Sequence, residues 1–191
     1  MKHIVHKAYW DFEKEEKWLN EMSAKGMALT DYSWCRYVFT ETPNNEYTYR
    51  IEFLGNKPTH ADSIAYIRFL EESGVECVAT YNWWIFLRRK SSEGSFDIYS
   101  DIESKIKHYK RVNVLWDTGM WVEFMAGLIN LIVGIVNLNI GNTLSNFSFI
   151  LAKVNLILGF SLVLLGLLFL RLGLPIRKKI KKLQQEKAIR E

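Results

Sequence analysis

Residues 19–29 read LNEMSAKGMAL, and residues 67–77, 48 positions further on, read IRFLEESGVEC. In both stretches apolar residues recur at helical spacing, and a glycine then precedes another apolar residue. Gly26 aligns with Gly74, and a glycine at this place is typical of the left-handed residue that ends a helix. We therefore predict two copies of one structural unit in the first half of the chain. The alternative is chance, because a helix followed by glycine and a strand is common.

Aromatic and β-branched residues flank both predicted helices, which is typical of strands. The predicted strands are 3–9, 33–41, 46–54 and 83–90, with 27–30 and 75–80 as short strands or kinked strand starts. The turn PNN at 43–45 is predicted to join two of these strands as a hairpin. The order βαββαβ predicts an α+β, ferredoxin-like soluble domain over 1–90, with both helices on one face of an antiparallel sheet.

Two long apolar segments, 121–140 and 147–170, dominate the second half of the chain. About 20 apolar residues suffice for a helix to cross the ~30 Å hydrocarbon core of a bilayer. Because the link GNTLSN (141–146) is short and uncharged, we predict an antiparallel transmembrane helical hairpin over 119–170. Lys and Arg precede the first segment and follow the second, whereas the link has none. This asymmetry predicts a multi-pass protein of the plasma membrane with both termini cytoplasmic.

Small residues recur at intervals of seven within these segments, accompanied by asparagines. The set expected to pack is Gly127, Asn130, Gly134, Asn137, Gly141, Ala152, Asn155, Gly159 and Gly166. Small residues let two helices approach closely, so we expect Gly134 and Gly159 to face each other. The asparagines are expected to bond across the hairpin, and a path for a polar ligand or ion is the alternative. Intramembrane charges are Glu123, at the cytoplasmic border, and Lys153, whose amine should extend toward the outer border.

The remaining segments surround the hairpin. Residues 91–118 are predicted as a linker, with a flexible break at 91–97, followed by an amphipathic juxtamembrane helix. Residues 171–191 are predicted as a basic, amphipathic cytoplasmic tail. A basic cluster beside a span is attracted to anionic lipids of the inner leaflet. Because the aromatic or groove-reading pattern of a nucleic-acid binder is missing, no nucleic acid is expected as a partner.

The sequence offers no motif for catalysis or metal binding. Its four histidines form no HExxH pair, its two cysteines lack metal-ligand spacing, and it has no phosphate-binding glycine loop. We therefore expect no enzyme activity, no cofactor and no metal. The aromatic-rich strands suggest instead an open sheet face that binds a peptide, ligand or protein, or else aromatic residues that simply cover the sheet. The residues of the candidate binding face are Trp34, Arg36, Tyr49, Arg50, Trp83 and Trp84.

The segment EKEEKWLNEMSAKGMAL (13–29) and the strands after it resemble a bacterial family known as domain of unknown function 2812. The residues that carry the resemblance, within 5–90, are Trp18, Leu19, Met22, Gly26, Leu29, Tyr37, Phe39, Tyr47, Tyr49 and Arg50. The resemblance implies no catalytic residues. It implies a protein typical of Firmicutes, with membrane spans after the domain, encoded beside PadR-type transcriptional regulators.

These features lead us to expect a membrane-anchored cytoplasmic sensor or adaptor that binds a protein or ligand in envelope-response regulation. The expected partners are membrane lipids and a regulator or larger membrane protein, with homo-oligomerisation as a further option. The alternative is an accessory subunit of a transporter or small-solute pore, suggested by the polar residues of the spans. Two spans cannot enclose a path alone, so this alternative requires an oligomer or a larger partner.

Overall fold

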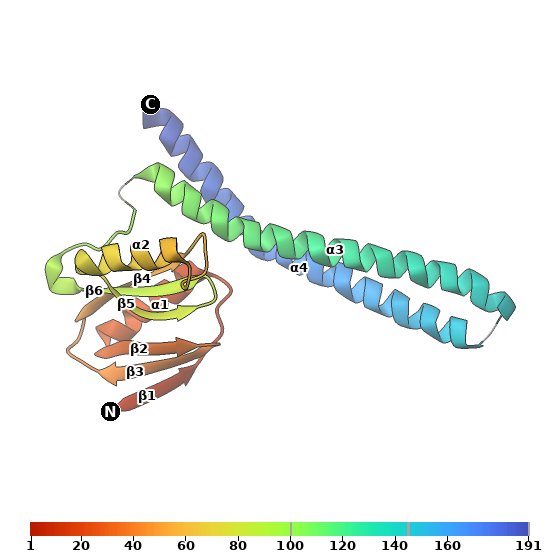
Figure 1. Cartoon of the computed structure of the whole chain (residues 1–191), viewed down its shortest axis with the longest axis horizontal. Helices are drawn as coiled ribbons and strands as arrows, with labels where there is room; N and C mark the ends of the chain where they lie inside the picture. Colours follow the sequence, from red (N-terminus) through yellow and green to blue (C-terminus); the bar gives the residue numbers. More distant parts are fainter. Residues whose placement is uncertain (100, 145, 191) are drawn as a thin grey trace. The chain divides into compact units, whose positions relative to one another are not determined.

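The computed structural model describes residues 1–99, 101–144 and 146–190, and side chains are described except at 140–147. The chain separates into two compact units, Met1–Arg111 and Val112–Glu191. The first unit holds all the strands of the described residues, and the second holds most of two long helices (Figure 1).

The first unit consists of two β-α-β-β repeats. The first repeat contains β1 (Lys2–His6), α1 (Phe12–Ala24), β2 (Met27–Ser33) and β3 (Arg36–Glu41). The second contains β4 (Tyr47–Phe53), α2 (Ala61–Glu72), β5 (Glu76–Tyr81) and β6 (Trp84–Lys90), and the short 3-10 helix η1 (Ser91–Glu93) follows it. The similarity between residues 19–29 and 67–77 therefore reflects two copies of one unit.

Each repeat forms its own antiparallel sheet of three strands, in the orders β1-β3-β2 and β4-β6-β5 (Figure 1). The pairing of β2 with β3 is interrupted between Leu29 and Asp31. The pairing of β5 with β6 is interrupted between Cys77 and Ala79, 48 residues later. The two copies thus share an irregularity of the backbone as well as their order of elements.

The predicted ferredoxin-like arrangement is not confirmed, because the unit has six strands in two sheets rather than four strands in one. The segments 27–30 and 75–80 belong to full strands, β2 and β5, which take one edge of each sheet. The turn at 43–45 forms no hairpin, since it leads from β3 in one sheet to β4 in the other. The physical reason is that β3 already pairs with β1 and β2 on its two sides, so β4 finds no free edge there.

The ends of the two helices follow from local sequence. The side chain of Asp11 caps α1 by accepting hydrogen bonds from two backbone amides of the first turn. The second helix is capped by the His60 side chain, which accepts a hydrogen bond from the Asp62 N–H. Gly26 and Gly74 follow the helices with φ of +76° and +82°, which is the left-handed conformation that glycine adopts without strain.

The core of the first unit has two clusters of buried side chains. One joins α1 to both sheets and contains Leu19, Leu29, Tyr37, Phe39, Tyr49, Ile51 and Phe86. The other joins α2 to the second sheet and contains Leu54, Leu70, Val75, Ile85, Leu87 and Phe96. Because Phe96 is only 5 % exposed, the segment 91–97 contributes to the core instead of forming a loose break. Burying one such ring contributes about 1.5–3 kcal/mol.

The second unit is formed by α3 (Ile102–Leu144) from residue 112 onward and by α4 (Asn146–Arg190). Both helices are long and apolar enough to cross a membrane. The juxtamembrane helix expected within 91–118 is the beginning of α3, and the expected basic tail is the end of α4, beyond Pro175.

Candidate functional site

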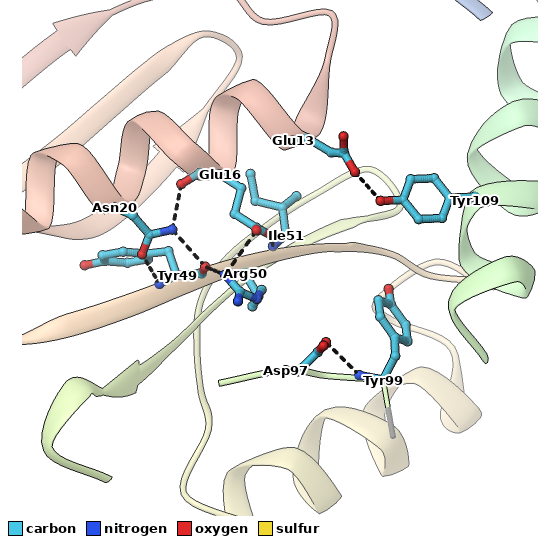
Figure 2. A network of polar contacts seen from close by, with 9 residues as sticks. All are labelled: Glu13, Glu16, Asn20, Tyr49, Arg50, Ile51, Asp97, Tyr99 and Tyr109. Carbon is cyan, nitrogen blue, oxygen red and sulfur yellow. Dashed lines mark hydrogen bonds and ion pairs between the residues drawn. The ribbon is translucent and has the colours of Figure 1, made fainter. Parts of the chain in front are cut away.

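The free edge of β4 is capped by side chains of α1. Because β4 is an edge strand of its sheet, the N–H and C=O groups of alternate residues have no neighbouring strand to form hydrogen bonds with. The Asn20 Oδ1 accepts a hydrogen bond from the Tyr49 N–H at 2.8 Å, and its Nδ2 donates to the Tyr49 carbonyl at 3.1 Å (Figure 2). The Glu16 carboxylate accepts from the Ile51 N–H at 3.0 Å. One face of the helix thus takes the place of a neighbouring strand.

Ser23 extends this series, since its hydroxyl donates to the Tyr47 carbonyl at 2.6 Å. The three capping residues of α1 span seven positions, or about 10 Å of helix axis. The three strand residues that they contact span four positions, or about 13 Å. The two spacings match closely enough for one helix face to follow the strand edge, so α1 of the first repeat is attached to the second sheet.

The two sheets are also joined at Leu29, beside the interruption in β2. Its N–H donates to the Tyr49 hydroxyl at 2.8 Å, and its carbonyl accepts from the Arg88 Nη1 at 3.0 Å. The Arg88 guanidinium is held in place by Glu76 at 2.8 Å. The backbone groups that the irregular pairing frees are therefore satisfied by the other repeat.

Glu15 is a buried carboxyl group in the first repeat, 9 % exposed. It accepts a hydrogen bond from the Tyr37 hydroxyl at 2.5 Å. Burial raises the pKa of Glu15 to about 7, although the hydrogen bond from Tyr37 opposes this rise. The carboxyl group therefore titrates near neutral pH.

A pocket of about 380 Å³ lies between β4, α2, the segment before α3 and the first turns of α3. This volume falls in the range of small-molecule sites. The polar side chains in its lining that bear on its chemistry are Glu52, Asp62, Tyr66, Tyr99, Lys107 and Arg111. All of them belong to the first unit.

Glu52 is the most deeply buried charge of the pocket, at 3 % exposure. Its carboxylate accepts hydrogen bonds from the Tyr66 hydroxyl at 2.8 Å and from the Arg111 Nη2 at 3.3 Å. The Arg111 Nε also donates to the Phe53 carbonyl at 3.1 Å. Burial raises the pKa of Glu52, and the Tyr66 hydrogen bond and the Arg111 charge oppose that rise. This cluster ties α2 and α3 to β4.

Two polar groups at this end of the unit have no hydrogen-bond partner among the residues that the structure describes. They are the hydroxyl of Tyr99, which lines the pocket, and the ring nitrogens of His108. The His108 ring packs against Phe12 and Tyr99, with centroids 5.1 and 5.3 Å away. Burial lowers the pKa of His108 to about 3, so the ring is neutral at physiological pH. A neutral ring contributes no positive charge to this end of the unit.

The first turns of α3 also contact the first repeat. The Tyr109 hydroxyl donates a hydrogen bond to the Glu13 carboxylate on α1 (Figure 2). Because Arg111 holds β4 of the second repeat, the start of α3 is bound to both copies. A change at the pocket therefore acts on a helix that both repeats hold.

The residues predicted as a binding face are not gathered on one open surface. Tyr49 is fully buried, and Arg50 forms an ion pair with Glu16 at 3.1 Å. Trp84 packs against aromatic rings of α1 and β4. These three side chains therefore have packing or ion-pair contacts within the unit.

The other members of that set lie in or beside the turns between paired strands. Trp34 is 73 % exposed in the turn between β2 and β3, and Trp83 is partly exposed in the turn between β5 and β6. Arg36 forms an ion pair with Asp31 at 3.6 Å. Trp34, Arg36 and Trp83 are the most exposed members of the predicted set.

In the second unit, small residues lie where α3 and α4 meet. A Cβ atom on Gly127 would lie 3.0 Å from the Gly159 carbonyl oxygen, and one on Gly134 would lie 3.1 Å from that of Ala152. Gly127, and not Gly134, is therefore opposite Gly159. The seven-residue spacing places these residues on one face, but it leaves their vertical alignment open. At Gly166 a Cβ atom would meet a phenylalanine ring of α3.

The polar residues of the spans show little contact across the hairpin. Asn130 donates to the Ala126 carbonyl of its own helix at 2.8 Å, which replaces the expected bond across the hairpin. Lys153 is exposed, with Nζ 4.4 Å from the centroid of a neighbouring phenylalanine ring. Asn137, Asn155 and Glu123 are half-buried. Gly141, also expected to pack, lies outside the residues whose surroundings the structure describes.

Sequence analysis missed two polar clusters. One is the pocket cluster around Glu52, whose signal is a carboxylate between the apolar residues Ile51 and Phe53 of a strand. The other is an ion pair between Asp117 on α3 and Arg177 on α4, supported by Asn113, which donates to Asp117 at 2.6 Å. Its signal is an isolated acid just before the first apolar segment begins. In both cases the partner is about 60 residues away, so sequence alone does not pair them.

Comparison with known proteins gives one match. The family model described as Protein of unknown function (DUF2812) matches residues 11–121. No curated protein and no solved structure matches the chain. The matched range contains every residue that lines the pocket.

Proposed function

The chain belongs to this family of unknown function (DUF2812), and we propose that it is a membrane-anchored sensor or adaptor whose first unit binds a ligand or protein. One observation supports the proposal most directly. Helix α3 contributes Ser104, Lys107 and Arg111 to the pocket, and the same helix is long and apolar enough to cross a membrane. A ligand in the pocket would therefore contact the helix that anchors the chain.

The contacts of Arg111 suggest how binding would be sensed. This side chain holds α3 to β4 through the Glu52 carboxylate and the Phe53 carbonyl. A ligand that draws the guanidinium away from Glu52 weakens that attachment. The change would reach a partner, a regulator or a larger membrane protein in an envelope response, without any chemical reaction.

Co-purification tests this function. Full-length protein is extracted from membranes, and the proteins bound to it are quantified by mass spectrometry. We expect one enriched partner whose recovery changes with Arg111→Gln but not with Arg89→Gln. Arg89 is a matched control because its side chain is also half-buried and forms an ion pair with a glutamate, at 3.0 Å, outside the pocket. If no partner is enriched and turnover of a small molecule is found instead, the proposal is wrong.

We further propose a plasma-membrane hairpin with both termini cytoplasmic, next to anionic inner-leaflet lipids, on the basis of the Lys and Arg distribution. The test uses a background in which Cys35 and Cys77 are replaced by serine. An impermeant thiol reagent added to intact cells should label Asn142→Cys and should not label Ser92→Cys. The reverse pattern would overturn this orientation.

The alternative, an accessory subunit of a transporter or pore, depends on the polar residues of the spans. Asn130 bonds to its own helix, and Lys153 is exposed on the surface of the second unit. Neither contact builds a polar path between α3 and α4. The pocket therefore gives the sensor proposal the stronger support.

A further inference from the structure

The polar atoms around the pocket that are available to a ligand are mainly hydrogen-bond donors. Arg111 uses Nε for the Phe53 carbonyl and Nη2 for Glu52, so its Nη1 has no partner among the described residues. The Tyr99 hydroxyl is also without a partner there, and it is buried. Lys107 adds an ammonium group whose ion pair with an exposed glutamate, at 3.4 Å, is open to solvent.

The acidic groups of the pocket, in contrast, already have partners. Glu52 accepts from Tyr66 with one carboxylate oxygen and from Arg111 with the other. Asp62 lies 3.5 Å from the amide of Asn56. A ligand that brings acceptors and negative charge would therefore find a free donor on Arg111, whereas a cation bound at Glu52 would have to displace the existing partners of that carboxylate.

We propose that this pocket, which Tyr99 helps to line, binds a small organic anion, a carboxylate or a phosphate ester, through Arg111 and Lys107. The inference rests on the proposed sensor function and names the class of its ligand. A guanidinium group fits both anions because its N–H donors pair with two oxygens at once. The volume of about 380 Å³ restricts the ligand to a small molecule.

The bound anion competes with Glu52 for Arg111. Burial already favours the neutral form of the Glu52 carboxyl group by raising its pKa, and the loss of Arg111 favours that form further. Binding of the anion therefore favours uptake of a proton by Glu52. The other titratable or charged groups that line the pocket are Tyr66 and Asp62 on α2, Tyr99, and Lys107 and Arg111 on α3. Burial raises the pKa of both tyrosines, so they stay protonated at neutral pH.

Isothermal titration calorimetry on the full chain in an uncharged detergent tests the proposal. The probes are succinate, inorganic phosphate and the uncharged analogue succinamide. We expect saturable binding of succinate or phosphate, and the tighter of the two identifies the class of anion. Arg111→Gln should weaken binding roughly 10- to 100-fold, since it removes a charged donor. Arg89→Gln, outside the pocket, should leave it unchanged.

Glu52→Gln is the sharper variant, because it keeps the acceptor for Tyr66 and removes the charge that competes for Arg111. It should tighten binding of the anion by about tenfold, the value of one freed charge-assisted hydrogen bond. It should also abolish proton uptake, which is measured by repeating the titration in buffers of different ionisation enthalpy. This variant decides the question even if Arg111→Gln does not fold.

Three results would overturn the inference. These are failure of both anions to bind, equal binding of succinamide, and weaker anion binding by Glu52→Gln than by the wild type. A chain that binds succinate yet recruits no protein would overturn the sensor function and leave the ligand class intact. Recruitment of a partner without anion binding would do the reverse.

Discussion

Replacing Asn20 with alanine tests whether α1 acts as the missing neighbour of β4. The substitution removes both hydrogen bonds to the backbone of Tyr49, one from its N–H and one to its carbonyl. Tyr49 is fully buried, so water cannot replace them. Each buried group left without a partner costs about 1–3 kcal/mol. Alanine returns about 0.5 kcal/mol through its higher helix propensity. We therefore expect a net loss of about 2–5 kcal/mol.

The assay is urea unfolding of the full chain in detergent, followed by near-ultraviolet circular dichroism. Glu21→Ala is the control, because Glu21 is exposed on the same helix and its ion pair with Lys17 spans 4.0 Å. We expect the control to change stability by less than about 0.5 kcal/mol. Asn20→Asp keeps an acceptor for the Tyr49 N–H and loses the donor, so it should fall between the two.

Hydrogen exchange supplies a local measurement for the same variant. The Tyr49 amide should exchange faster in Asn20→Ala even under conditions where the unit stays folded. If Asn20→Ala and Glu21→Ala have equal stabilities, the bonds to Tyr49 contribute nothing measurable. The interpretation of α1 as an edge cap would then be wrong.

Three further changes test other parts of the chain. The pKa of Glu15, about 7, lies above its ordinary 4.5, so between these two pH values the folded state holds a proton that the unfolded state releases. The free energy of unfolding should therefore fall by about 3 kcal/mol as pH rises from 4.5 to 7. Glu15→Gln should remove that fall in pH-dependent urea unfolding, and equal slopes would contradict the assignment. Gly26→Ala should lower the stability of the first unit by more than about 1 kcal/mol, because the added Cβ would lie 2.7 Å from a carbonyl oxygen. Gly94→Ala is the control, since φ is also positive there but no atom lies within 4 Å of the added Cβ, and it should cost less. In detergent, Gly134→Leu should lower the melting temperature of the second unit because it forces α3 and α4 apart, whereas the exposed Val133→Leu should barely change it; equal shifts would mean that the helices meet through another face.

Local sequence determines where the helices of the first unit begin and end. Asp11 caps α1, and Gly26 and Gly74 terminate the two helices, because capping and left-handed backbone depend on a few neighbouring residues. Repetition of these signals at an interval of 48 residues is also a property of the sequence. The repeat, both helices and the two apolar segments are therefore predictable without tertiary structure.

The division into two sheets depends on competition between strands. Strand-forming residues on both sides of the turn at 43–45 are compatible with a hairpin, and sequence does not show that β3 has two other neighbours. The lengths of β2 and β5 depend on the same pairing, because a strand ends where its neighbour stops bonding to it. Sheet topology is thus a long-range property.

The candidate site also depends on contacts between residues that are far apart in the sequence. Glu52 and Arg111 are far apart in the chain, and each is by itself an ordinary charged residue. Tertiary folding brings them together, removes water from Glu52 and, among the described residues, leaves the Nη1 of Arg111 free beside it. The site is defined by charge, burial and free hydrogen-bond donors together. Of these three, only the charge can be predicted from the sequence.

The two apolar segments show most clearly which features depend on sequence and which depend on tertiary structure. Their length and seven-residue spacing of small residues follow from sequence alone, and this spacing selects the helix faces that can approach closely. Tertiary structure decides the alignment, in which Gly127 and not Gly134 lies opposite Gly159. If one helix moved by seven residues along the other, small residues would still face each other. The alignment of the two helices therefore depends on how the larger side chains around the small residues pack.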